Sequence, residues 1–355
     1  MILGAGTSSS AFCTLCGSVS RTRPSALLSL LPMSKTKVAI IGVGYLGRQH
    51  ARIYSELDSV ELVGVVDKNA ETAAAVASEF ATTAYTDFRD LLGKVTAASL
   101  AAPTTEHASI GCELLRQGID VLVEKPIASS LDEAEALIQT ARAHRRILQV
   151  GHLERFNPAV VAARSLARHP LFFEVHRLGV FTSRSLDIDV VFDLMIHDLD
   201  VVLDLVRSPV RSVSAVGLPI LSRKVDIANA RIEFESGCVA NLTASRVSTE
   251  KVRKLRFFQP RQYVSLDYTR QDVVVLSVKP GEGGAPPVIV PRKIETARVE
   301  PLKVEVESFL NAVRNRTEPE VTAESSKQAL ELAQRVVEQI RAHTASLSVP
   351  VEEKS

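Results

Sequence analysis

The chain has 355 residues, of which 46% are apolar and 23% are charged, and its formal net charge is +1. This composition is that of a globular protein of about two domains. The small net charge excludes the strongly basic field of a nucleic-acid-binding protein. No long apolar run (roughly 18 residues or more) occurs, which excludes an apolar membrane-spanning helix, and we expect a cytoplasmic protein.

The N-terminal segment and the cysteines carry no catalytic signal. Residues 1–34 are rich in Ser, Thr, Gly and Ala, and we expect a disordered or non-native extension, with Met33 as the start of the working protein. A transit peptide is the alternative. Cys13 and Cys16 have the spacing of half a zinc site, but no second pair completes it, so we expect no metal.

Residues 38–67 have the pattern of a dinucleotide-binding βαβ unit. An apolar run leads into Gly42-Val43-Gly44-Tyr45-Leu46-Gly47, and a helix-like segment and a second apolar run follow. Gly42 permits a tight turn, Gly44 leaves room for the cofactor pyrophosphate, and Gly47 lets the helix pack closely on the strand. The free N–H groups of the following helix would bind phosphate.

Asp67 ends the second strand of this unit. Its carboxylate can accept hydrogen bonds from the ribose hydroxyls of NAD, and its charge would repel the 2′-phosphate of NADP. We therefore favour NAD. The neighbouring Lys68 could reach a phosphate, so NADP remains the alternative.

The elements expected up to residue 151 alternate in type. Strands are predicted at 37–42, 61–67, 96–101, 119–123 and 147–150, and helices at 45–57, 70–80, 105–117 and 130–146. Alternation of this kind predicts a Rossmann-type, doubly wound parallel sheet over residues 35–152, in which the ligand lies beyond the carboxyl ends of the strands.

The pattern changes after residue 151. Helices are predicted at 158–169, 191–206, 301–316 and 323–343, with a Pro/Gly-rich loop at 279–292 and a tail at 344–355. Strands are predicted at 171–182, 211–219, 225–235, 238–247, 252–259, 262–268 and 272–278. We expect an α+β domain over residues 153–343, with a mostly antiparallel open sheet, that binds the substrate and forms the oligomer contact. The C-terminal helices would return to the first domain.

Three segments hold candidate chemical groups. Glu124-Lys125-Pro126 follows a strand directly, so Lys125 could assist proton removal from a hydroxyl; a surface turn is the alternative. Asp193 and His197 are four residues apart and share one helix face, as a general base and its orienting carboxylate would; a buried structural histidine is the alternative. Arg155 and Asn157, past strand 147–150, could contact cofactor or substrate, or serve only in a linker.

Taken in this order, with Pro103-Thr104-Thr105-Glu106-His107 after the strand at 96–101, these motifs resemble the glucose–fructose oxidoreductase / inositol dehydrogenase / rhizopine catabolism (Gfo/Idh/MocA) family from about residue 37 to about residue 340. The resemblance implies an NAD-dependent dehydrogenase in which Lys125, His197 and Asp193 act on the oxidised hydroxyl. It implies that the cofactor is bound by Gly42, Gly44, Tyr45, Leu46, Gly47, Asp67, Pro103, Thr104, His107, Glu124 and Lys125. One departure is Val190-Val191-Phe192, where many members have a glycine pair before the aspartate.

Residues 151–158 and 187–200 are further similar to the subfamily that oxidises the 3-hydroxyl of UDP-N-acetylglucosamine for lipid A precursors. The expected substrate is therefore a nucleotide sugar, bound by Arg155, Asn157, Arg184 and His197. Alternatives are a dehydrogenase of a free sugar or inositol, and a non-catalytic NAD-binding sensor. Because an open sheet needs its outer face covered, we expect a homodimer or homotetramer.

Overall fold

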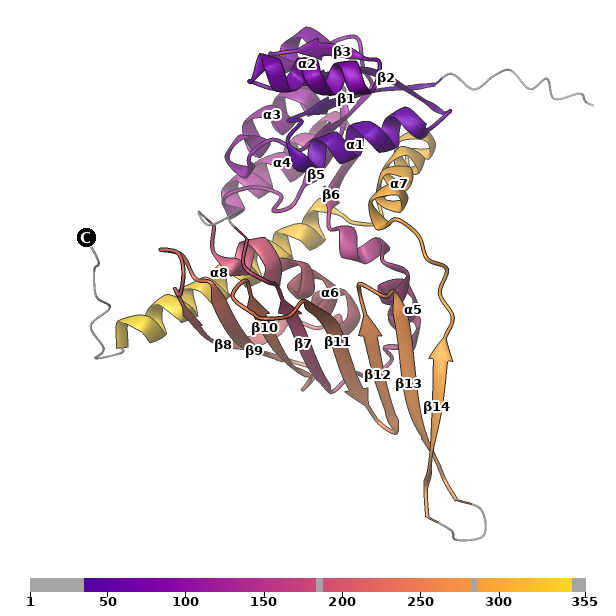
Figure 1. Ribbon diagram of the computed structural model, residues 1–355, viewed down its shortest axis with the longest axis vertical. Helices are drawn as coiled ribbons and strands as arrows, with labels where there is room; N and C mark the ends of the chain where they lie inside the picture. Colours follow the sequence, from indigo (N-terminus) through magenta and orange to yellow (C-terminus); the bar gives the residue numbers. More distant parts are fainter. Residues whose placement is uncertain (1–34, 183–187, 282–285, 347–355) are drawn as a thin grey trace, which may run out of the picture. The chain divides into compact units, whose positions relative to one another are not determined.

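The computed structural model describes residues 35–182, 188–281 and 286–346 (Figure 1). The expected extension over residues 1–34, with Cys13 and Cys16, lies outside these ranges, as does Arg184. No helix among the described residues is both long and apolar enough to cross a membrane.

A parallel six-stranded sheet forms the N-terminal half. Its strands are β1 (Thr36–Ile41), β2 (Val60–Val66), β3 (Thr83–Tyr85), β4 (Ala97–Leu100), β5 (Asp120–Glu124) and β6 (Leu148–Gly151), in the spatial order β3-β2-β1-β4-β5-β6. The order reverses between β1 and β4, and such a switch point is where a dinucleotide binds. The predicted doubly wound sheet is confirmed, and only the three-residue strand β3 lacked a recognisable apolar run.

Four α-helices lie between these strands, and two of them begin where a polar side chain accepts a hydrogen bond from a free backbone N–H group. They are α1 (Tyr45–Glu56), α2 (Ala70–Glu79), α3 (Thr104–Arg116) and α4 (Leu131–His144). Asn69 accepts a hydrogen bond from the Thr72 N–H at the start of α2, and Ser130 accepts one from the Glu133 N–H at the start of α4. At α1 and α3 the N-cap residues Gly44 and Pro103 make no side-chain cap hydrogen bond. The positive end of such a helix attracts an anionic ligand.

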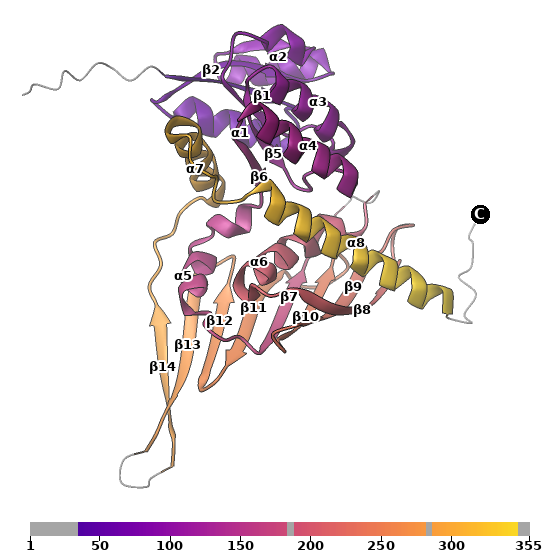
Figure 2. The ribbon, with the colours of Figure 1, turned by 180° about the vertical axis from the view of Figure 1, so that it is seen from behind.

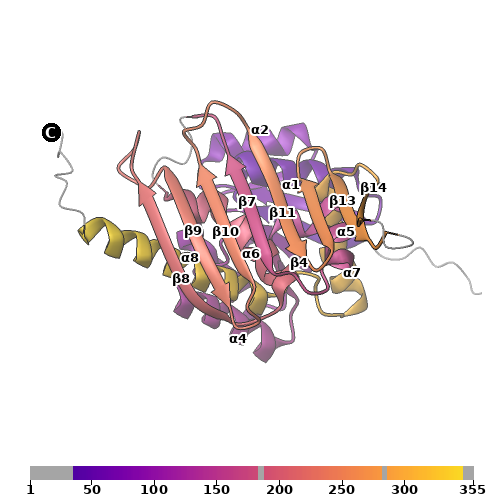
Figure 3. The ribbon, with the colours of Figure 1, turned by 90° about the horizontal axis from the view of Figure 1, so that it is seen from below.

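The C-terminal half contains an eight-stranded sheet, seen from its uncovered face in Figure 3. Its strands are β7 (Phe172–Leu178), β8 (Val210–Leu218), β9 (Ile227–Phe234), β10 (Val239–Ser245), β11 (Val252–Gln259), β12 (Gln262–Asp267), β13 (Asp272–Lys279) and β14 (Val288–Ile294). The order is β14-β13-β12-β11-β7-β10-β9-β8, and only the β7–β10 pair is parallel. The mostly antiparallel α+β arrangement is therefore confirmed.

Three helices cover one face of this sheet: α5 (Pro158–Leu166), α6 (Ile196–Val206) and α8 (Ala323–Ser346) (Figure 2). Along the central strands β7, β9 and β10, buried and more exposed residues alternate, as in Ala228, Ala230 and Ile232 of β9, so one face enters the core and the other meets solvent. Helix α8 also contributes Leu330 to the core beneath the parallel sheet. Helix α7 (Pro301–Asn315) packs Phe309 and Leu310 into the core formed with α1 and β1.

Several boundaries differ from the sequence prediction: α5 ends at Leu166 and not at residue 169, and β7 ends at Leu178 and not at residue 182. Two further differences have a clear cause. Residues 288–292, expected in a loop, belong to β14, an edge strand that pairs with β13. The residues of β14 do not alternate between apolar and polar types, so the sequence did not predict a strand there. Helix α8 continues to Ser346 instead of ending at residue 343, because Ala345 and Ser346 do not interrupt a helix.

Candidate active site

A cavity of about 780 Å³ lies at the carboxyl ends of β1, β2 and β4. Its position is the switch point of the parallel sheet, where a dinucleotide is expected. Its lining includes three groups predicted to bind the cofactor, from the glycine turn, the end of β2 and the loop after β4: Gly42, Gly44, Asp67 and Pro103.

The glycine turn has the steric features that its sequence predicts. Gly42 has φ +85°, and a Cβ on it would lie 2.5 Å from the Ala102 backbone N. A Cβ on Gly47 would lie 1.8 Å from the Gly42 carbonyl oxygen, so only glycine permits this helix–strand contact. A Cβ on Gly44 would meet no described atom within 4 Å, which leaves the first turn of α1 open to a pyrophosphate. Tyr45 and Leu46 are exposed beside it.

The Asp67 carboxylate is held by the backbone. Oδ2 accepts a hydrogen bond from the Val43 N–H (3.0 Å) and Oδ1 accepts one from the Asn69 N–H (2.9 Å), so the carboxylate stays at the mouth of the cavity. The Lys68 ammonium lies 3.2 Å from a Glu106 carboxylate oxygen. The cation that could have bound a 2′-phosphate is thus paired within the protein.

His107 contacts two loops, one after β4 and one after β5, at the expected nicotinamide end of the site. Its ring nitrogens lie 2.9 Å from the Ala102 carbonyl oxygen and 3.0 Å from that of Pro126, and the side chain is buried. Burial lowers the pKa of the imidazole. His107 therefore links the loop after β4 with the loop after β5, while Thr104 begins α3 beside Pro103.

Lys125 follows β5 directly and reaches the helical segment that carries Asp193. Its ammonium donates a hydrogen bond to the Asp193 carbonyl oxygen (2.9 Å) and lies 4.0 Å from Oδ1 of the same residue. Burial lowers the pKa of Lys125, and the charges of Asp193 and Glu124 oppose that shift. The lysine is thus a partly buried cation fixed by both halves of the chain.

Asp193 and His197 lie on two different kinds of helix. Asp193 belongs to a π-helical turn, Val191–Met195, which continues into α6 with His197 in its first turn. Isolated π-turns within helices occur frequently at functional sites. The His197 Nδ1 atom is buried and has no hydrogen-bond partner among the described residues. The side chain that contacts Asp193 among the described residues is that of Lys125, so the expected Asp193–His197 pair does not form directly.

The His197 imidazole is surrounded by positive charge. Burial, followed by the charges of Lys125 and Arg177, lowers the pKa of His197 well below its usual value. The ring is therefore neutral at neutral pH and can accept a proton. A neutral imidazole can act as a general base, and an ammonium can donate a hydrogen bond to a substrate oxygen.

Two arginines on the covered face of the second sheet were missed by the sequence reading. Arg177 is buried; its guanidinium bonds both Asp198 carboxylate oxygens (2.6 and 2.9 Å) and Glu154 Oε1 (3.0 Å). Arg253 is its direct neighbour on β11. The signal was present in the sequence, because period-two alternation places Arg177 with Phe173 and Val175 on the inward face.

Comparisons with known proteins agree with this geometry. The family model described as "Oxidoreductase family, NAD-binding Rossmann fold" matches residues 36–152, and that of the "GFO/IDH/MocA C-terminal domain" matches residues 159–261. The chain belongs to the Gfo/Idh/MocA family of oxidoreductases.

Among members of this family, a UDP-N-acetylglucosamine 3-dehydrogenase from Acidithiobacillus ferrooxidans is 38% identical over 282 residues, which are 79% of this chain and 90% of that protein. A solved structure of that enzyme has a TM-score of 0.81 and 35% identity, and the match covers 87% of this chain and 99% of that one. The NAD⁺-dependent scyllo-inositol 2-dehydrogenase of Bacillus subtilis is 27% identical, with coverage of 81% and 89%. The chain is therefore an oxidoreductase that resembles sugar and inositol dehydrogenases acting on CH–OH groups.

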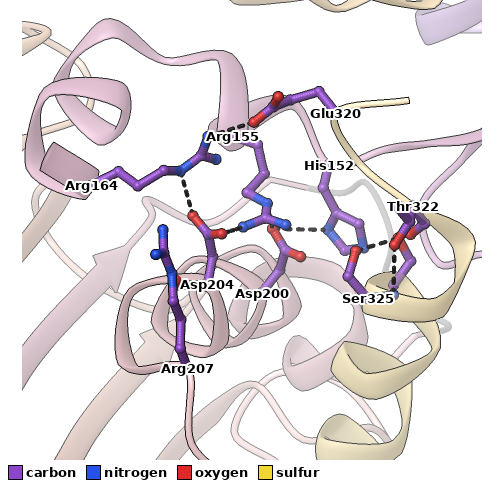
Figure 4. Close-up of polar contacts among 10 residues, drawn as sticks. His152, Arg155, Arg164, Asp200, Asp204, Arg207, Glu320, Thr322 and Ser325 are labelled. Atoms are coloured by element: carbon purple, nitrogen blue, oxygen red, sulfur yellow. Dashed lines mark hydrogen bonds and ion pairs between the residues drawn. The ribbon is translucent and has the colours of Figure 1, made fainter. Parts of the chain in front are cut away.

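Arg155 has different partners from those expected of a substrate ligand in a Gfo/Idh/MocA enzyme (Figure 4). Its side chain is 6% exposed, its Nε lies 3.3 Å from Asp200 Oδ2, and a second ion pair joins it to Asp204. Arg164 also binds Asp204, at 2.7 Å. This ion-pair network ties the segment after β6 and helix α5 to α6, the helix that carries His197.

Asn157 is likewise buried and satisfied. Its side chain accepts a hydrogen bond from the Ala159 N–H (3.1 Å) at the start of α5 and donates to the Tyr268 carbonyl oxygen (3.0 Å). In the described structure both residues therefore connect elements around the site.

Proposed function

We propose that the chain catalyses the NAD-dependent oxidation of the 3-hydroxyl of UDP-N-acetylglucosamine to a ketone. The observation that carries the proposal is the position of Lys125 against Asp193, one helical turn from His197, in a chain 38% identical to a UDP-N-acetylglucosamine 3-dehydrogenase over most of both lengths. The product, a 3-keto sugar, suits amination by an aminotransferase, and we place it among lipid A precursors.

In this mechanism His197 accepts the hydroxyl proton. The imidazole is neutral because burial and nearby cations lower its pKa. Lys125 donates a hydrogen bond to the same oxygen and stabilises the negative charge that develops on it; the reverse assignment, with Lys125 as base, is the alternative. Asp193 holds the ammonium in place. NAD, when bound, would supply the hydride acceptor for this oxidation, and Gly42, Gly44 and Asp67 would hold it.

The residues present fit an NAD cofactor. The open first turn of α1 suits the pyrophosphate, and the backbone-held Asp67 suits the ribose hydroxyls. Asp67, Asp87, Glu106 and Glu113 around the cavity disfavour a further phosphate, although Lys68 and Arg89 lie there too. Those two cations are paired, Lys68 with Glu106 and Arg89 with Glu113, which supports NAD over NADP.

The diphosphate of the substrate requires a cation near His197, and Arg253 is the best candidate among the described residues. No hydrogen bond or close ion pair to its guanidinium occurs there, because Glu154 and Asp198 are bound to Arg177. Burial and the charge of Arg177 lower the pKa of Arg253, so an anionic ligand would relieve an unfavourable cation pair. The expected contribution of Arg184 stays a proposal, since it lies outside the described residues.

A panel of substrates tests the proposal. UDP-N-acetylglucosamine, free N-acetylglucosamine, glucose and inositol are each incubated with enzyme and NAD, and NADH formation is followed. We expect turnover with the UDP-sugar and far poorer turnover with the free sugars, because binding of the remote UDP group helps to position the hydroxyl. Preferential oxidation of inositol would favour the alternative dehydrogenase, and no turnover with any sugar would favour a non-catalytic sensor.

A further inference from the structure

Three ionisable side chains from separate elements meet in the core behind Lys125. They are His50 of α1 and Glu305 of α7, both 0% exposed, and Glu124 at the end of β5, which is 8% exposed. One ligand atom of each lies within 4.8 Å of one atom of both others. Only Glu124 was singled out from the sequence, and the mechanism above gives no role to His50 or Glu305.

His50 and Glu124 are well satisfied. The His50 Nε2 lies 2.9 Å from Glu124 Oε1, and Nδ1 lies 3.2 Å from the Ser99 hydroxyl, which in turn lies 2.9 Å from the Tyr54 hydroxyl. The other Glu124 oxygen accepts a hydrogen bond from the Lys125 backbone N–H (3.3 Å). This carboxylate therefore has a donor on each oxygen.

Glu305 differs in that neither of its carboxyl oxygens has a hydrogen-bond partner among the described residues. The Oε1 atom of Gln149 is also buried without one, while the amide Nε2 of Gln149 donates to the Glu305 backbone carbonyl oxygen (3.2 Å). An ionised carboxylate with no donor in the protein interior would be strongly unfavourable. A neutral carboxylic acid instead has a hydrogen to donate, and a Glu124 carboxylate oxygen lies within 4.8 Å of a Glu305 carboxyl oxygen.

Electrostatics decide which of the two glutamates is ionised. The Glu124 pKa lies below its usual value, because His50 and Lys125 outweigh the effect of burial. Burial and the charge of Glu124 raise the pKa of Glu305 well above its usual value. Two neighbouring buried carboxylates repel each other, so a proton bound by the pair favours Glu305 over Glu124.

A metal ion is the competing occupant of such a cluster. A tetrahedral site with bonds of about 2.0–2.1 Å places its ligand atoms about 3.3 Å apart. The 2.9 Å contact between His50 and Glu124 is instead a hydrogen bond, which occupies the lone pairs that a metal would need. The geometry of His50, Glu124 and Glu305 therefore favours a bound proton over a bound metal ion.

We propose that Glu305 is a neutral carboxylic acid that donates its hydrogen bond toward the Glu124 carboxylate, and is thereby a positioning residue behind Lys125. This hydrogen bond from Glu305 stabilises the negative charge of Glu124 and fixes the orientation of its carboxylate. Glu124 then holds the Lys125 backbone and supplies a negative charge near the ammonium. Tyr54, His50 and Lys125 are the other titratable groups that face this pair. The catalytic consequence rests on the proposed role of Lys125; the protonation state of Glu305 does not.

The first test compares Glu305→Gln with Glu307→Gln, a matched control at an exposed position of the same helix. Glutamine cannot ionise but can still donate. A carboxyl whose folded-state pKa is raised favours folding below its unfolded pKa, and that contribution is lost as pH rises through the folded pKa. Glu305→Gln should therefore raise Tm relative to wild type by an amount that grows from acidic to neutral pH. The control should show no such trend.

The second test observes the proton itself. At neutral pH the infrared spectrum of the wild-type protein in D₂O should contain the carbonyl band of a buried protonated carboxyl, and the band should vanish in Glu305→Gln but persist in Glu307→Gln. A missing band, or a Tm that falls in Glu305→Gln together with loss of a stoichiometric divalent metal from the purified protein, would overturn the proposal in favour of a carboxylate ligand.

The third test addresses the coupling to Lys125. Glu305→Gln should retain kcat within about threefold, whereas Glu305→Leu, which cannot donate, should lower kcat roughly tenfold or more with little change in the KM for NAD. Equal loss in both variants would contradict the positioning role. If no sugar is oxidised by any variant, the proposed function fails, but the infrared and Tm results still decide the protonation state.

Discussion

At the residue scale, Asp67 provides the sharpest test of cofactor choice. Its carboxylate is fixed by two backbone N–H groups at the mouth of the dinucleotide cavity. Asp67→Ala should narrow the preference for NAD over NADP, because the repulsion of a 2′-phosphate disappears. The measurement is the ratio of kcat/KM for the two cofactors. Lys68→Ala is the control, and an unchanged ratio in Asp67→Ala would refute the assignment.

Lys125 and His197 should act on the same hydroxyl. Replacing either with alanine should lower kcat by roughly 10²–10⁴, the usual effect of removing a positioned acid–base group. NAD affinity should change little, because neither side chain lines the dinucleotide cavity at the switch point. Steady-state kinetics combined with NAD titration checks both statements, and near-normal turnover of Lys125→Ala would contradict the mechanism.

The sequence was informative about these residues for a physical reason. The glycine turn, Asp67 and Lys125 follow strands directly, so their place at the ligand end of the sheet follows from strand direction alone. The partners of Arg155 could not be read in the same way. Asp200 and Asp204 lie on a helix distant in sequence, and only packing of that helix brings them to the guanidinium.

At the scale of elements, the ion-pair network around Arg155 should stabilise the fold near α6. Arg155→Ala would leave the Asp200 carboxylate, which is 2% exposed, without its closest cation. Breaking a buried ion pair from one side costs about 3–5 kcal/mol. Chemical unfolding monitored by circular dichroism should show a loss of that size in the free energy of unfolding.

The control for this prediction is Arg211→Ala. Arg211 pairs with Glu233 at 2.9 Å, but its side chain is 61% exposed. An exposed pair contributes about 0–1 kcal/mol. If both variants lost the same small free energy, Arg155 would not hold the structure in the way its contacts indicate.

The elements themselves were largely predictable, with two exceptions that share a cause. Periodicity identified the helix carrying Asp193 and His197, but it could not distinguish a π-turn from an α-turn, since both place apolar residues inward. The edge strand β14 was missed because pairing with β13, and not burial, defines it. The local pattern of apolar residues indicates which side chains are buried, but it does not indicate which backbone groups pair by hydrogen bonds.

At the scale of the whole molecule, the uncovered face of the eight-stranded sheet should pair with a second copy (Figure 3). Phe172, Phe258 and Tyr263 form an aromatic row on this face, with ring centroids 5.7 and 5.1 Å apart. Val216, Leu218, Val274 and Val278 are exposed on the strands β8 and β13. Apolar area of this kind is typical of a subunit interface.

We therefore predict that Phe258→Glu dissociates the homo-oligomer, since a desolvated charge would face the partner. Analytical ultracentrifugation should show a lower mass for this variant at the same concentration. Val161→Glu, at an exposed position of α5, is the matched control and should keep the wild-type mass. A wild-type protein that is monomeric at micromolar concentration would contradict the prediction.

Oxidation of a nucleotide sugar can be measured by comparing kcat/KM for UDP-N-acetylglucosamine and for free N-acetylglucosamine, in the wild-type enzyme and in Arg253→Gln. We expect the wild-type enzyme to prefer the UDP-sugar strongly and NMR of its product to show a ketone at C3. Arg253→Gln should lose roughly tenfold or more of kcat/KM for the UDP-sugar alone. Equal efficiency with the free sugar or with inositol, unaffected by Arg253→Gln, would contradict this expectation.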